Sequence, residues 1–468
     1  MADFTNHTFD EIDVGTSETV TRTVTANEVE ALSLAAGDVE SFHTRGADRA
    51  LGKGPSTQGA AAAAILAGML NRRLPGPGGA IIGSQLQYGG AIHVGDTLTA
   101  TVTARAKHVD GHRIEFECRC SNQHGDVLAV GMVTVSAPTR RVAYSNLATP
   151  QIVLRHNDGF VPLFAACAEM PAIVCAVVHP CDRDSLQGAV DAAAHDLIEP
   201  FLVGPEPKIR AVAEAEGIDI SPFRIIPVEH SHAAAAKAVE MARAGKVHAL
   251  MKGSLHTDEL MEAVVPSATG LRTARRISHV FVMDVPTYPR LLFVTDCAIN
   301  INPDLETKAD ICRNAIDLAH ILGIAEPRVA ILSAVETVNP KLQGTLDAAA
   351  LCKMADRGQI TGGLLDGPLA FDNAISLEAA RTKGIVSDVA GRADILLVPD
   401  LEAGNILAKQ QQYLAGADSA GIVLGTRVPI VLTSRADSVR ARLASAAVLK
   451  LVAHEQRQRL LPKPRGVT

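Results

Sequence analysis

The sequence of 468 residues is too long for one ordinary domain, and at about 150 residues per domain it predicts two or three. Apolar residues make up 47% and charged residues 20%, which excludes a disordered chain; aromatic residues are only 3%, so the cores consist of Ala, Leu, Ile and Val. The net charge is −7 and no long run of Lys or Arg is present, which argues against a nucleic-acid partner.

The eight cysteines contain no C-x-x-C pair, so in a chain of this length we expect buried, reduced thiols rather than a disulfide framework. The first residues, MADFTNHTFDEIDVG, are polar and acidic and show no secretory signal. The apolar run Ala60–Leu66 is too short to cross a bilayer. We therefore expect a cytoplasmic protein with no membrane partner.

Residues 1–145 are predicted to form one α+β domain with a helix pair followed by an antiparallel meander. The expected helices are Ala26–Ala36 and Gly59–Leu70, and the expected strands are Ser17–Val24, Ala80–Tyr88, Thr97–His108, Arg113–Asn122 and Val127–Ser136. Turn residues at Asp110–Gly111 and Gly125–Asp126 separate the last three strands. One long helix followed by such a meander describes a hotdog fold, in which a sheet wraps a central helix.

Asp38 and His43 are the candidate catalytic residues of this domain. Together, a carboxylate and an imidazole supply an acid and a base that can add water across a conjugated double bond. The helix start at Gly59 offers free N–H groups that can polarise a thioester carbonyl. From spacing alone, a helix cap and a surface histidine explain the same two residues.

The segments Gly37–Asp38, His43, Gly59 and Val94–Thr97 resemble the MaoC-type (R)-specific enoyl-CoA hydratases over most of residues 10–137. The resemblance implies that Asp38 and His43 activate water and that the backbone N–H of Gly59 binds the thioester oxygen. Glu40–Ser41 stands where the family usually has Asn-Pro, and Ala67 lies near the position where the family often has Ser.

Ala137–Gln151 is polar and lacks periodicity, so it is interpreted as a linker. Strands then alternate with helices, which predicts a parallel, doubly wound α/β domain over residues 155–468. The expected strands are Ile173–Val178, Phe201–Val203, Phe223–Val228, Ala249–Met251, Ser278–Met283, Leu291–Asp296 and Arg328–Leu332. The expected helices are Asp184–His195, Glu206–Gly217, Ala233–Gly245, Thr257–Val264, Leu305–Gly323 and Leu346–Arg357.

Several polar residues follow these strands. Lys252 and Gly253 sit at a strand end before a helix, where an anionic ligand can bind, and the P-loop pattern is absent. His230 and His232 lack a third ligand, so they are expected to start a helix or line a cleft rather than bind metal. The arginines at positions 272, 275 and 276 either hold coenzyme A phosphates or form a solvated face.

The stretch from Asp366 to Ser438 carries the main chemical signal. Its two apolar runs, Ile395–Val398 and Ile430–Thr433, each end in a polar cluster. Ligands of parallel α/β sheets bind at the carboxyl ends of strands, so these clusters are candidates for chemistry. We expect them to form one wall of a cleft, with Lys252–Gly253 and His179–Pro180 opposite.

Residues of about 158–460 resemble the phosphate acetyl/butyryltransferases, somewhat closer to the butyryl type. The motifs that carry this resemblance are Val177–Pro180, Leu202–Pro205, Met251–Gly253, Asp366–Leu369, Phe371–Asp372, Ala393–Asp394, Pro399–Asn405 and Thr433–Ser438. The resemblance implies two α/β subdomains, about 155–295 with 434–468 and about 296–433, with the active site between them.

The reaction that this resemblance implies is acyl-CoA + phosphate ⇌ acyl phosphate + CoA. Ser434 would then donate to the developing oxyanion, Arg435 would bind phosphate, and Asp437 would be the base for the coenzyme A thiol. Asn405 is a candidate phosphate contact, and Lys252, Gly253 and Arg272 are candidate substrate-binding residues. Acyl-CoA and phosphate are substrates, so no cofactor and no metal is expected.

The leading hypothesis is therefore a bifunctional coenzyme A enzyme that forms at least a dimer, because hotdog sheets commonly pair. A second hypothesis keeps only the acyltransferase and treats the N-terminal half as an inactive acyl-CoA-binding or oligomerisation module, which Glu40–Ser41 motivates. A third, from fold analogy, is a metal- and NAD-dependent decarboxylating dehydrogenase. Neither a GxGxxG motif nor a paired-carboxylate metal set supports that third hypothesis.

Overall fold

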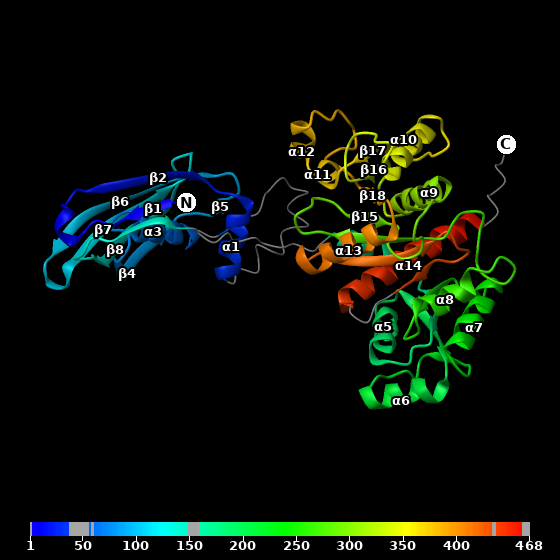
Figure 1. The fold of residues 1–468 in the computed structure, drawn as a ribbon. Coiled ribbons are helices and arrows are strands. Elements are labelled where there is room, and N and C mark those ends of the chain that lie inside the picture. The colour runs from blue at the N-terminus through cyan, green and yellow to red at the C-terminus, as the bar shows by residue number, and fades with distance from the viewer. Residues whose placement is uncertain (1, 37–55, 58–59, 148–158, 433–436, 461–468) are drawn as a thin grey trace, which may run out of the picture. The chain divides into compact units, whose positions relative to one another are not determined.

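The computed structural model describes residues 2–36, 56–57, 60–147, 159–432 and 437–460. The chain divides into two compact units, Met1–Arg155 and His156–Thr468 (Figure 1). Each unit has its own hydrophobic core. Over the described ranges, no helix is both long enough and apolar enough to cross a membrane.

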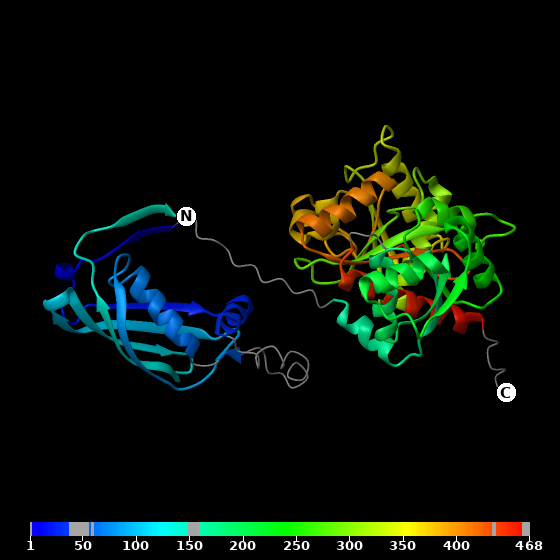
Figure 2. The same ribbon diagram turned by 90° about the horizontal axis from the view of Figure 1, so that it is seen from below.

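The N-terminal unit is a five-stranded antiparallel sheet in the order β2-β6-β7-β8-β4, and helix α3 packs against one of its faces (Figure 2). Its elements are β1 (Ala2–Thr5), β2 (Ser17–Thr23), α1 (Ala26–Ala36), β3 (Ser56–Thr57), α3 (Ala60–Arg72), β4 (Ala80–Tyr88), β5 (Ile92–His93), β6 (Thr97–His108), β7 (Arg113–Ser121), β8 (Val127–Ser136) and β9 (Ala143–Leu147). The bounds of the predicted helices and strands are confirmed to within a few residues. The predicted meander is confirmed for β6, β7 and β8, but β4 pairs with β8 instead of β6, so it is wrong for β4.

The two faces of this sheet differ in chemistry, as the alternation along β6 predicts. Leu98, Ala100 and Val102 point into the core beneath α3 and are fully buried. The intervening threonines face the hydroxyl residues of β2, and Thr19 and Thr101 bond to each other at 2.9 Å. Apolar side chains on one face and cross-strand hydroxyl pairs on the other fix the register of the strands.

Two short strand pairs were not predicted. β1 pairs with β9, and β3 pairs with β5, each antiparallel. β9 lies inside Ala137–Gln151, so the interpretation of that whole segment as a linker is wrong for Ala143–Leu147. Strands of two to five residues carry too little periodicity to be recognised in a sequence.

The C-terminal unit is built on one eleven-stranded sheet in the order β12-β11-β10-β13-β20-β19-β14-β15-β18-β16-β17. Its strands are β10 (Ile173–Val178), β11 (Ile198–Gly204), β12 (Arg224–Pro227), β13 (Ala249–Lys252), β14 (Ser278–Asp284), β15 (Leu292–Thr295), β16 (Arg328–Leu332), β17 (Leu364–Leu369), β18 (Ile395–Leu397), β19 (Asp418–Leu424) and β20 (Ile430–Val431). Its helices are α4 (Val161–Ala168), α5 (Arg183–Ala194), α6 (Glu206–Glu216), α7 (Ser231–Arg243), α8 (Thr257–Val264), α9 (Leu305–Ile321), α10 (Gln343–Asp356), α11 (Phe371–Ile375), α12 (Leu377–Thr382), α13 (Leu401–Leu414) and α14 (Val439–Leu460).

The prediction of an all-parallel sheet is wrong in the middle of this sheet. β14 runs antiparallel to both β15 and β19, and β19 runs antiparallel to β20. The physical reason is the length of the connections: residues 285–291 and 425–429 are too short for the crossover of a dozen or more residues that parallel neighbours need. The strands toward the two ends of the sheet pair in parallel. One group is β12, β11, β10 and β13, and the other is β15, β18, β16 and β17.

Helices cover both faces of the sheet, so a central strand is apolar along its whole length. In β10, Ile173, Cys175 and Val177 belong to the core beneath α5 and α14, whereas Ala176 and Val178 belong to the core beneath α7. This explains the unbroken apolar run in the sequence. All eight cysteines are free thiols and most of them are buried, which confirms the prediction.

His279 is a fully buried histidine on the central strand β14. Its ring packs edge-on against Phe281 with the centroids 4.5 Å apart, and its Nδ1 has no hydrogen-bond partner. Burial lowers the pKa of His279 to about 4 because the apolar surroundings disfavour the imidazolium. The folded unit therefore holds His279 neutral.

Gly131→Ala in β8 is expected to destabilise the N-terminal unit by about 1–3 kcal/mol, because overpacked atoms must move apart. A Cβ at Gly131 would lie 2.0 Å from the carbonyl oxygen of Gln85 on β4. Gly68→Ala on α3 is the control: nothing lies within 4 Å, so the variant is expected to gain about 0.5–1 kcal/mol from helix propensity. Urea unfolding followed by pulsed hydrogen exchange of the β8 peptide measures both, and equal stability of the two variants would contradict the prediction.

Stability of the C-terminal unit is expected to fall on acidification because of His279. An unfolded chain binds a proton at this residue with a pKa near 6.5, whereas the folded chain does so only near 4, so protons favour unfolding as the pH falls from 6.5 to 4. The difference corresponds to about 3 kcal/mol in total, of which about 2 kcal/mol appears between pH 7 and pH 5. Urea unfolding with pulsed exchange of the β14 peptide should show this loss in the wild type and a smaller loss in His279→Leu.

Candidate functional site

Five predicted site residues, Asp38, His43, Gly59, Ser434 and Arg435, lie outside the described residues. Helix α3 begins at Ala60, directly after Gly59, as expected from the sequence. The other predicted residues, Lys252, Gly253, Arg272, Asn405 and Asp437, are described.

Lys252 and Gly253 lie where three parallel strands end together. Val178 at the end of β10 is in register with Lys252 at the end of β13, and Met251 is in register with Val431 at the end of β20. The chain leaves β20 toward residues 433–436, which hold the predicted Ser434–Arg435 pair. The sheet therefore brings the predicted anion-binding residues to the same edge at which β20 ends.

The turn after β13 is bonded tightly onto the end of β10. The N–H of Gly253 donates to the carbonyl of Val178 at 2.8 Å, and the N–H of Ser254 donates to the carbonyl of His179 at 2.9 Å. A Cβ at Gly253 would lie 2.4 Å from the carbonyl oxygen of Val178, so only glycine fits. Lys252 is half-buried, and its Nζ donates to the carbonyls of Gly253 at 3.3 Å and Leu255 at 3.2 Å.

His179 follows β10 with a positive φ of 56°, which is uncommon for a residue with a side chain. Its Nδ1 lies 3.0 Å from Oγ of Ser254, and that hydroxyl donates to the carbonyl of His179 at 2.8 Å. Burial lowers the pKa of His179, with the positive charge of Lys208 acting in the same direction and Glu259 and Asp182 opposing it. Sequence reasoning placed His179 on a cleft wall but missed its pairing with Ser254, which lies 75 residues further along the chain.

Asp437 is half-buried just before helix α14. Its backbone carbonyl accepts from Nη1 of Arg442 at 2.9 Å. The adjacent Ser438 caps the helix, because its hydroxyl accepts from the N–H of Ala441 at 3.1 Å. A strand-to-helix cap therefore accounts for Ser438.

A second polar cluster lies where β15 ends, and the sequence reasoning did not single it out. The buried carboxylate of Asp296 accepts from the backbone N–H groups of Ala298 and Ile299 at 2.9 and 3.1 Å. It also accepts from the backbone and side-chain N–H groups of Asn300. Burial raises the pKa of Asp296, and these hydrogen bonds oppose that shift. The signal that was available is the polar cluster itself, at a strand end in the segment 296–300.

Asn405 lies in the first turns of α13, next to this cluster. Asp400 caps the helix by accepting from the N–H of Ala403 at 2.8 Å, and Gly404 packs so closely that a Cβ would lie 2.4 Å from the carbonyl oxygen of Asp296. The side-chain amide of Asn405 donates to the carbonyl of Cys297 at 3.1 Å. This hydrogen bond holds α13 against the loop after β15, and the predicted phosphate contact stays a prediction.

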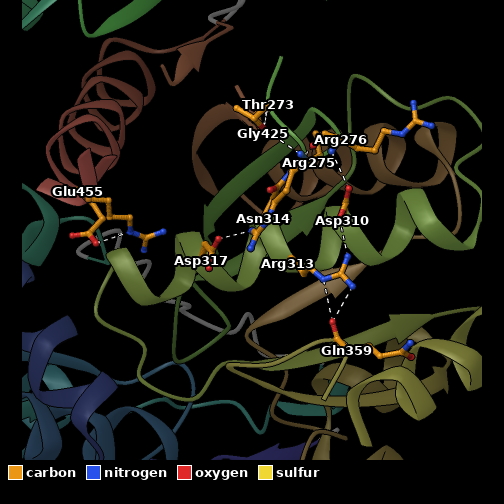
Figure 3. Close-up of polar contacts among 12 residues, drawn as sticks. Thr273, Arg275, Arg276, Asp310, Arg313, Asn314, Asp317, Gln359, Gly425 and Glu455 are labelled. Atoms are coloured by element: carbon orange, nitrogen blue, oxygen red, sulfur yellow. Dashed lines mark hydrogen bonds and ion pairs between the residues drawn. The ribbon is translucent and has the colours of Figure 1, made fainter. Parts of the chain in front are cut away.

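The arginine-rich segment before β14 is held in place by carboxylates of α9 (Figure 3). Arg275 pairs with Asp317, the backbone N–H of Arg276 donates to Asp310 at 3.0 Å, and Arg313 also pairs with Asp310. Arg272 is exposed, and its backbone forms a bridge with Thr426. The structure therefore assigns Arg275 an ion pair within the fold and leaves Arg272 on the surface.

The predicted site residues fall at opposite ends of the strands. β20 and β14 run in one direction and β15 and β18 run in the other. Lys252, Gly253 and the end of β20 share one edge of the sheet, whereas Arg272 before β14 and Asn405 after β18 share the other. That the end of β20 and Lys252–Gly253 line facing walls of a cleft stays a prediction, because Ser434 and Arg435 lie outside the described residues.

An apolar cavity of about 260 Å³ lies beside Asn405's helix, at the ends of β16 and β18. It is lined by Leu332, Ser333, Ala334, Phe371, Val398, Pro399, Ala403 and Leu407. Only one of these side chains, that of Ser333, carries a polar group. The cavity can take a short hydrocarbon group but offers little to hold a charge.

A larger cavity of about 870 Å³ lies in the N-terminal unit along the exposed side of α3. Val20, Leu32 and Ile65 supply apolar surface, and the charged lining includes Arg72 and the ion pair of Arg22 with Glu28. The cavity therefore combines apolar surface with charged groups of both signs.

Comparison with known proteins shows which family the C-terminal unit resembles. A family model described as phosphate acetyl/butaryl transferase matches residues 229–449. The chain is 66% identical over 293 residues to the phosphate acetyltransferase of Rhizobium meliloti, covering 63% of this chain and 92% of that protein. The chain belongs to the phosphate acetyl/butyryltransferase family.

Two further relatives agree with this assignment. Phosphate butyryltransferase of Clostridium acetobutylicum is 43% identical over 285 residues, covering 61% of this chain and 94% of that protein. The solved structure of a branched-chain phosphotransacylase from Enterococcus faecalis V583 is 28% identical with a TM-score of 0.54, covering 60% of this chain and 99% of that one. The chain is more identical to the Rhizobium acetyltransferase than to this butyryltransferase. The prediction that the chain resembles the butyryl type more closely is therefore wrong for these two relatives.

The two histidines at the start of α7, which the sequence analysis considered as metal ligands, have structural roles. His230 is the N-cap of the helix, and its Nδ1 accepts from the N–H of Ala233 at 3.2 Å. His232 lies 3.4 Å from the carboxylate of Glu259. The prediction that these histidines start a helix is confirmed.

Proposed function

We propose that the C-terminal unit transfers a short acyl group reversibly between coenzyme A and phosphate, with acetyl or butyryl as the group. The observation that supports this most is the edge at which β10, β13 and β20 end together, because it gathers Lys252, Gly253 and His179 where the chain leaves β20. Membership of the phosphate acetyl/butyryltransferase family supports the same reaction. Acyl-CoA and phosphate are the proposed substrates.

In the proposed reaction the coenzyme A thiolate attacks the carbonyl carbon of the acyl phosphate. The C–S bond forms, the C–O bond to phosphate breaks, and the carbonyl oxygen carries negative charge in between. Ser434 is proposed to donate to that oxygen, and Arg435 to bind the phosphate through its planar fork of donors. Asp437 was predicted as the thiol base, and it stays a candidate for that role.

Arg435→Ala is expected to lower phosphate-dependent release of coenzyme A from acetyl-CoA or butyryl-CoA by at least 100-fold, since the positive charge proposed to bind the phosphate is lost. Arg357→Ala, an exposed arginine at the end of α10, is the matched control and should keep the wild-type rate. The measurement is thiol release with and without phosphate. An Arg435→Ala variant as active as the control would contradict the assignment of Arg435 to phosphate binding.

We propose a second activity for the N-terminal unit: hydration of enoyl-CoA to 3-hydroxyacyl-CoA on a hotdog fold. Two observations favour it. Helix α3 packs against a five-stranded antiparallel sheet, and the cavity along α3 combines apolar surface with the cation of Arg72, which suits an acyl chain joined to an anion. Asp38 and His43 would activate the water. The alternative is an inactive acyl-CoA-binding or oligomerisation module.

The wild type is expected to consume crotonyl-CoA, seen as a loss of absorbance at the enoyl thioester band, and Asp38→Asn is expected to be about 100-fold or more slower, because it lacks the acid–base carboxylate. Asp110→Asn is the control, since Asp110 is 98% exposed in a turn. Phosphate-dependent transfer by the same samples reports that the chain is folded. A wild type that hydrates no enoyl-CoA of any chain length favours the binding module.

A further inference from the structure

His179 and Ser254 form a pair at the edge where β10 and β13 end, and neither is among the residues that the family resemblance assigns to chemistry. Ser254 Oγ lies 3.0 Å from His179 Nδ1 and 2.8 Å from the backbone carbonyl oxygen of His179. It also accepts from the backbone N–H of Cys181 at 3.3 Å. One hydroxyl therefore makes three hydrogen bonds around His179.

The hydrogen bonds of Ser254 to described residues favour one tautomer of His179. A serine hydroxyl carries one hydrogen and two lone pairs. Its hydrogen goes to the carbonyl of His179, because a carbonyl oxygen can only accept. The remaining contact with Nδ1 requires that Nδ1 carries the hydrogen and donates it to Ser254. In the neutral ring, Nε2 then has a lone pair and can accept a proton.

The same hydrogen bonds argue against a serine nucleophile at this position. A histidine that activates serine must accept the hydroxyl hydrogen, whereas here the hydroxyl gives its hydrogen to a backbone carbonyl. Ser254 is thus a positioning residue that orients the imidazole. It plays the part that a carboxylate or a carbonyl plays for other catalytic histidines.

Nε2 of His179 is open to a substrate. It makes no hydrogen bond with any described residue, and it is not one of the polar atoms that are buried without a hydrogen-bond partner. The side chain is partly exposed. A lone pair that is neither buried nor engaged is available to a ligand at this edge of the sheet.

Burial is the largest factor that favours the neutral ring of His179, and the charges around it act in both directions. Lys208 on α6 disfavours the imidazolium, whereas Glu259 on α8 and Asp182 at the start of α5 favour it. Lys252 lies at the end of the neighbouring strand β13. Cys181 is two residues after His179, and burial raises the pKa of its thiol to about 11. With desolvation added, the balance lowers the pKa of His179 below 6.5, so the ring is a base at neutral pH.

The backbone supports a functional reading. His179 has a φ of 56°, and side-chain-bearing residues adopt such angles mainly where surrounding bonds impose them. Here the imposing bonds come from Ser254, whose N–H and hydroxyl both reach the carbonyl of His179. His179 is partly exposed at this edge of the sheet and is not part of the buried core.

We propose that His179 is the base that deprotonates the coenzyme A thiol, with Ser254 positioning its ring. The inference rests on the proposed phosphate acyl transfer. In the direction of thioester formation, Nε2 takes the proton from the thiol, the thiolate forms the C–S bond, and the acyl–phosphate C–O bond breaks. In reverse, the imidazolium returns that proton to the departing thiolate, so protons and electrons balance without another reactant.

His179→Asn is the first test, because asparagine tolerates a positive φ and its amide can still donate to Ser254, but it cannot take a proton. We expect kcat for thioester formation from acetyl phosphate and coenzyme A to fall by about 10²- to 10⁴-fold. Wild-type activity should rise with pH through an inflection below 6.5, as the ring loses its proton, and this acidic limb should vanish in the variant. His195→Gln, an exposed histidine at the end of α5, is the matched control that keeps both rate and limb.

His179→Gly supplies a test that a purely structural role would not pass. Glycine accepts the positive φ, and the space left by the ring admits free imidazole. Added imidazole is expected to restore thioester formation in His179→Gly and to leave His195→Gly unchanged. Carbethoxylation of the wild type by diethyl pyrocarbonate, with peptide mapping, covers the case in which the variants fail to fold: coenzyme A should protect His179 and not His195.

The outcomes separate this inference from the function on which it rests. A wild type that forms no thioester from any acyl phosphate overturns the proposed transfer itself. If the wild type is active, a His179→Asn variant that keeps its rate and acidic limb overturns only the role of His179. If imidazole does not rescue His179→Gly and coenzyme A does not protect His179, the role of His179 is likewise overturned.

Discussion

The antiparallel pairing of β14 with β15 and β19 is the interaction on which the C-terminal unit depends. It joins two groups of parallel strands, which run in opposite directions, into one hydrogen-bonded sheet. Because functional loops follow the carboxyl ends of parallel strands, the reversal divides the polar clusters between two edges. The full burial of His279 on β14 shows how completely this junction is enclosed.

At both edges, loops are held by hydrogen bonds to backbone groups rather than by apolar packing. Ser254 reaches the carbonyl of His179, and the carboxylate of Asp296 gathers the N–H groups of the loop that follows it. Gly253 and Gly404 allow the neighbouring backbones to approach so closely that any side chain would collide. Such loops are rigid, and rigidity holds a base or a donor in position before the substrate arrives.

The charges of the arginine-rich segment show why residue counts predict binding poorly. Arg275 is paired with Asp317 of α9, and Asn314 of the same helix holds the carbonyl of Arg276 at 2.9 Å. A carboxylate distant in the sequence thus neutralises a cation that looks free in the sequence. Arg272, whose side chain is exposed, is the arginine of this segment that best keeps its predicted role as a candidate ligand contact.

The sequence by itself determined most of the longer elements, though not the short strands β1, β3, β5 and β9, because period-2 and period-3.6 patterns and turn residues depend on local geometry. It also determined the family of the C-terminal unit through motifs such as Pro399–Asn405. Only the tertiary structure decided the strand directions in the middle of the sheet, the ion pair of Arg275 and the hydrogen bonds between His179 and Ser254. These depend on residues tens of positions apart, and no local pattern records which of them meet when the chain folds.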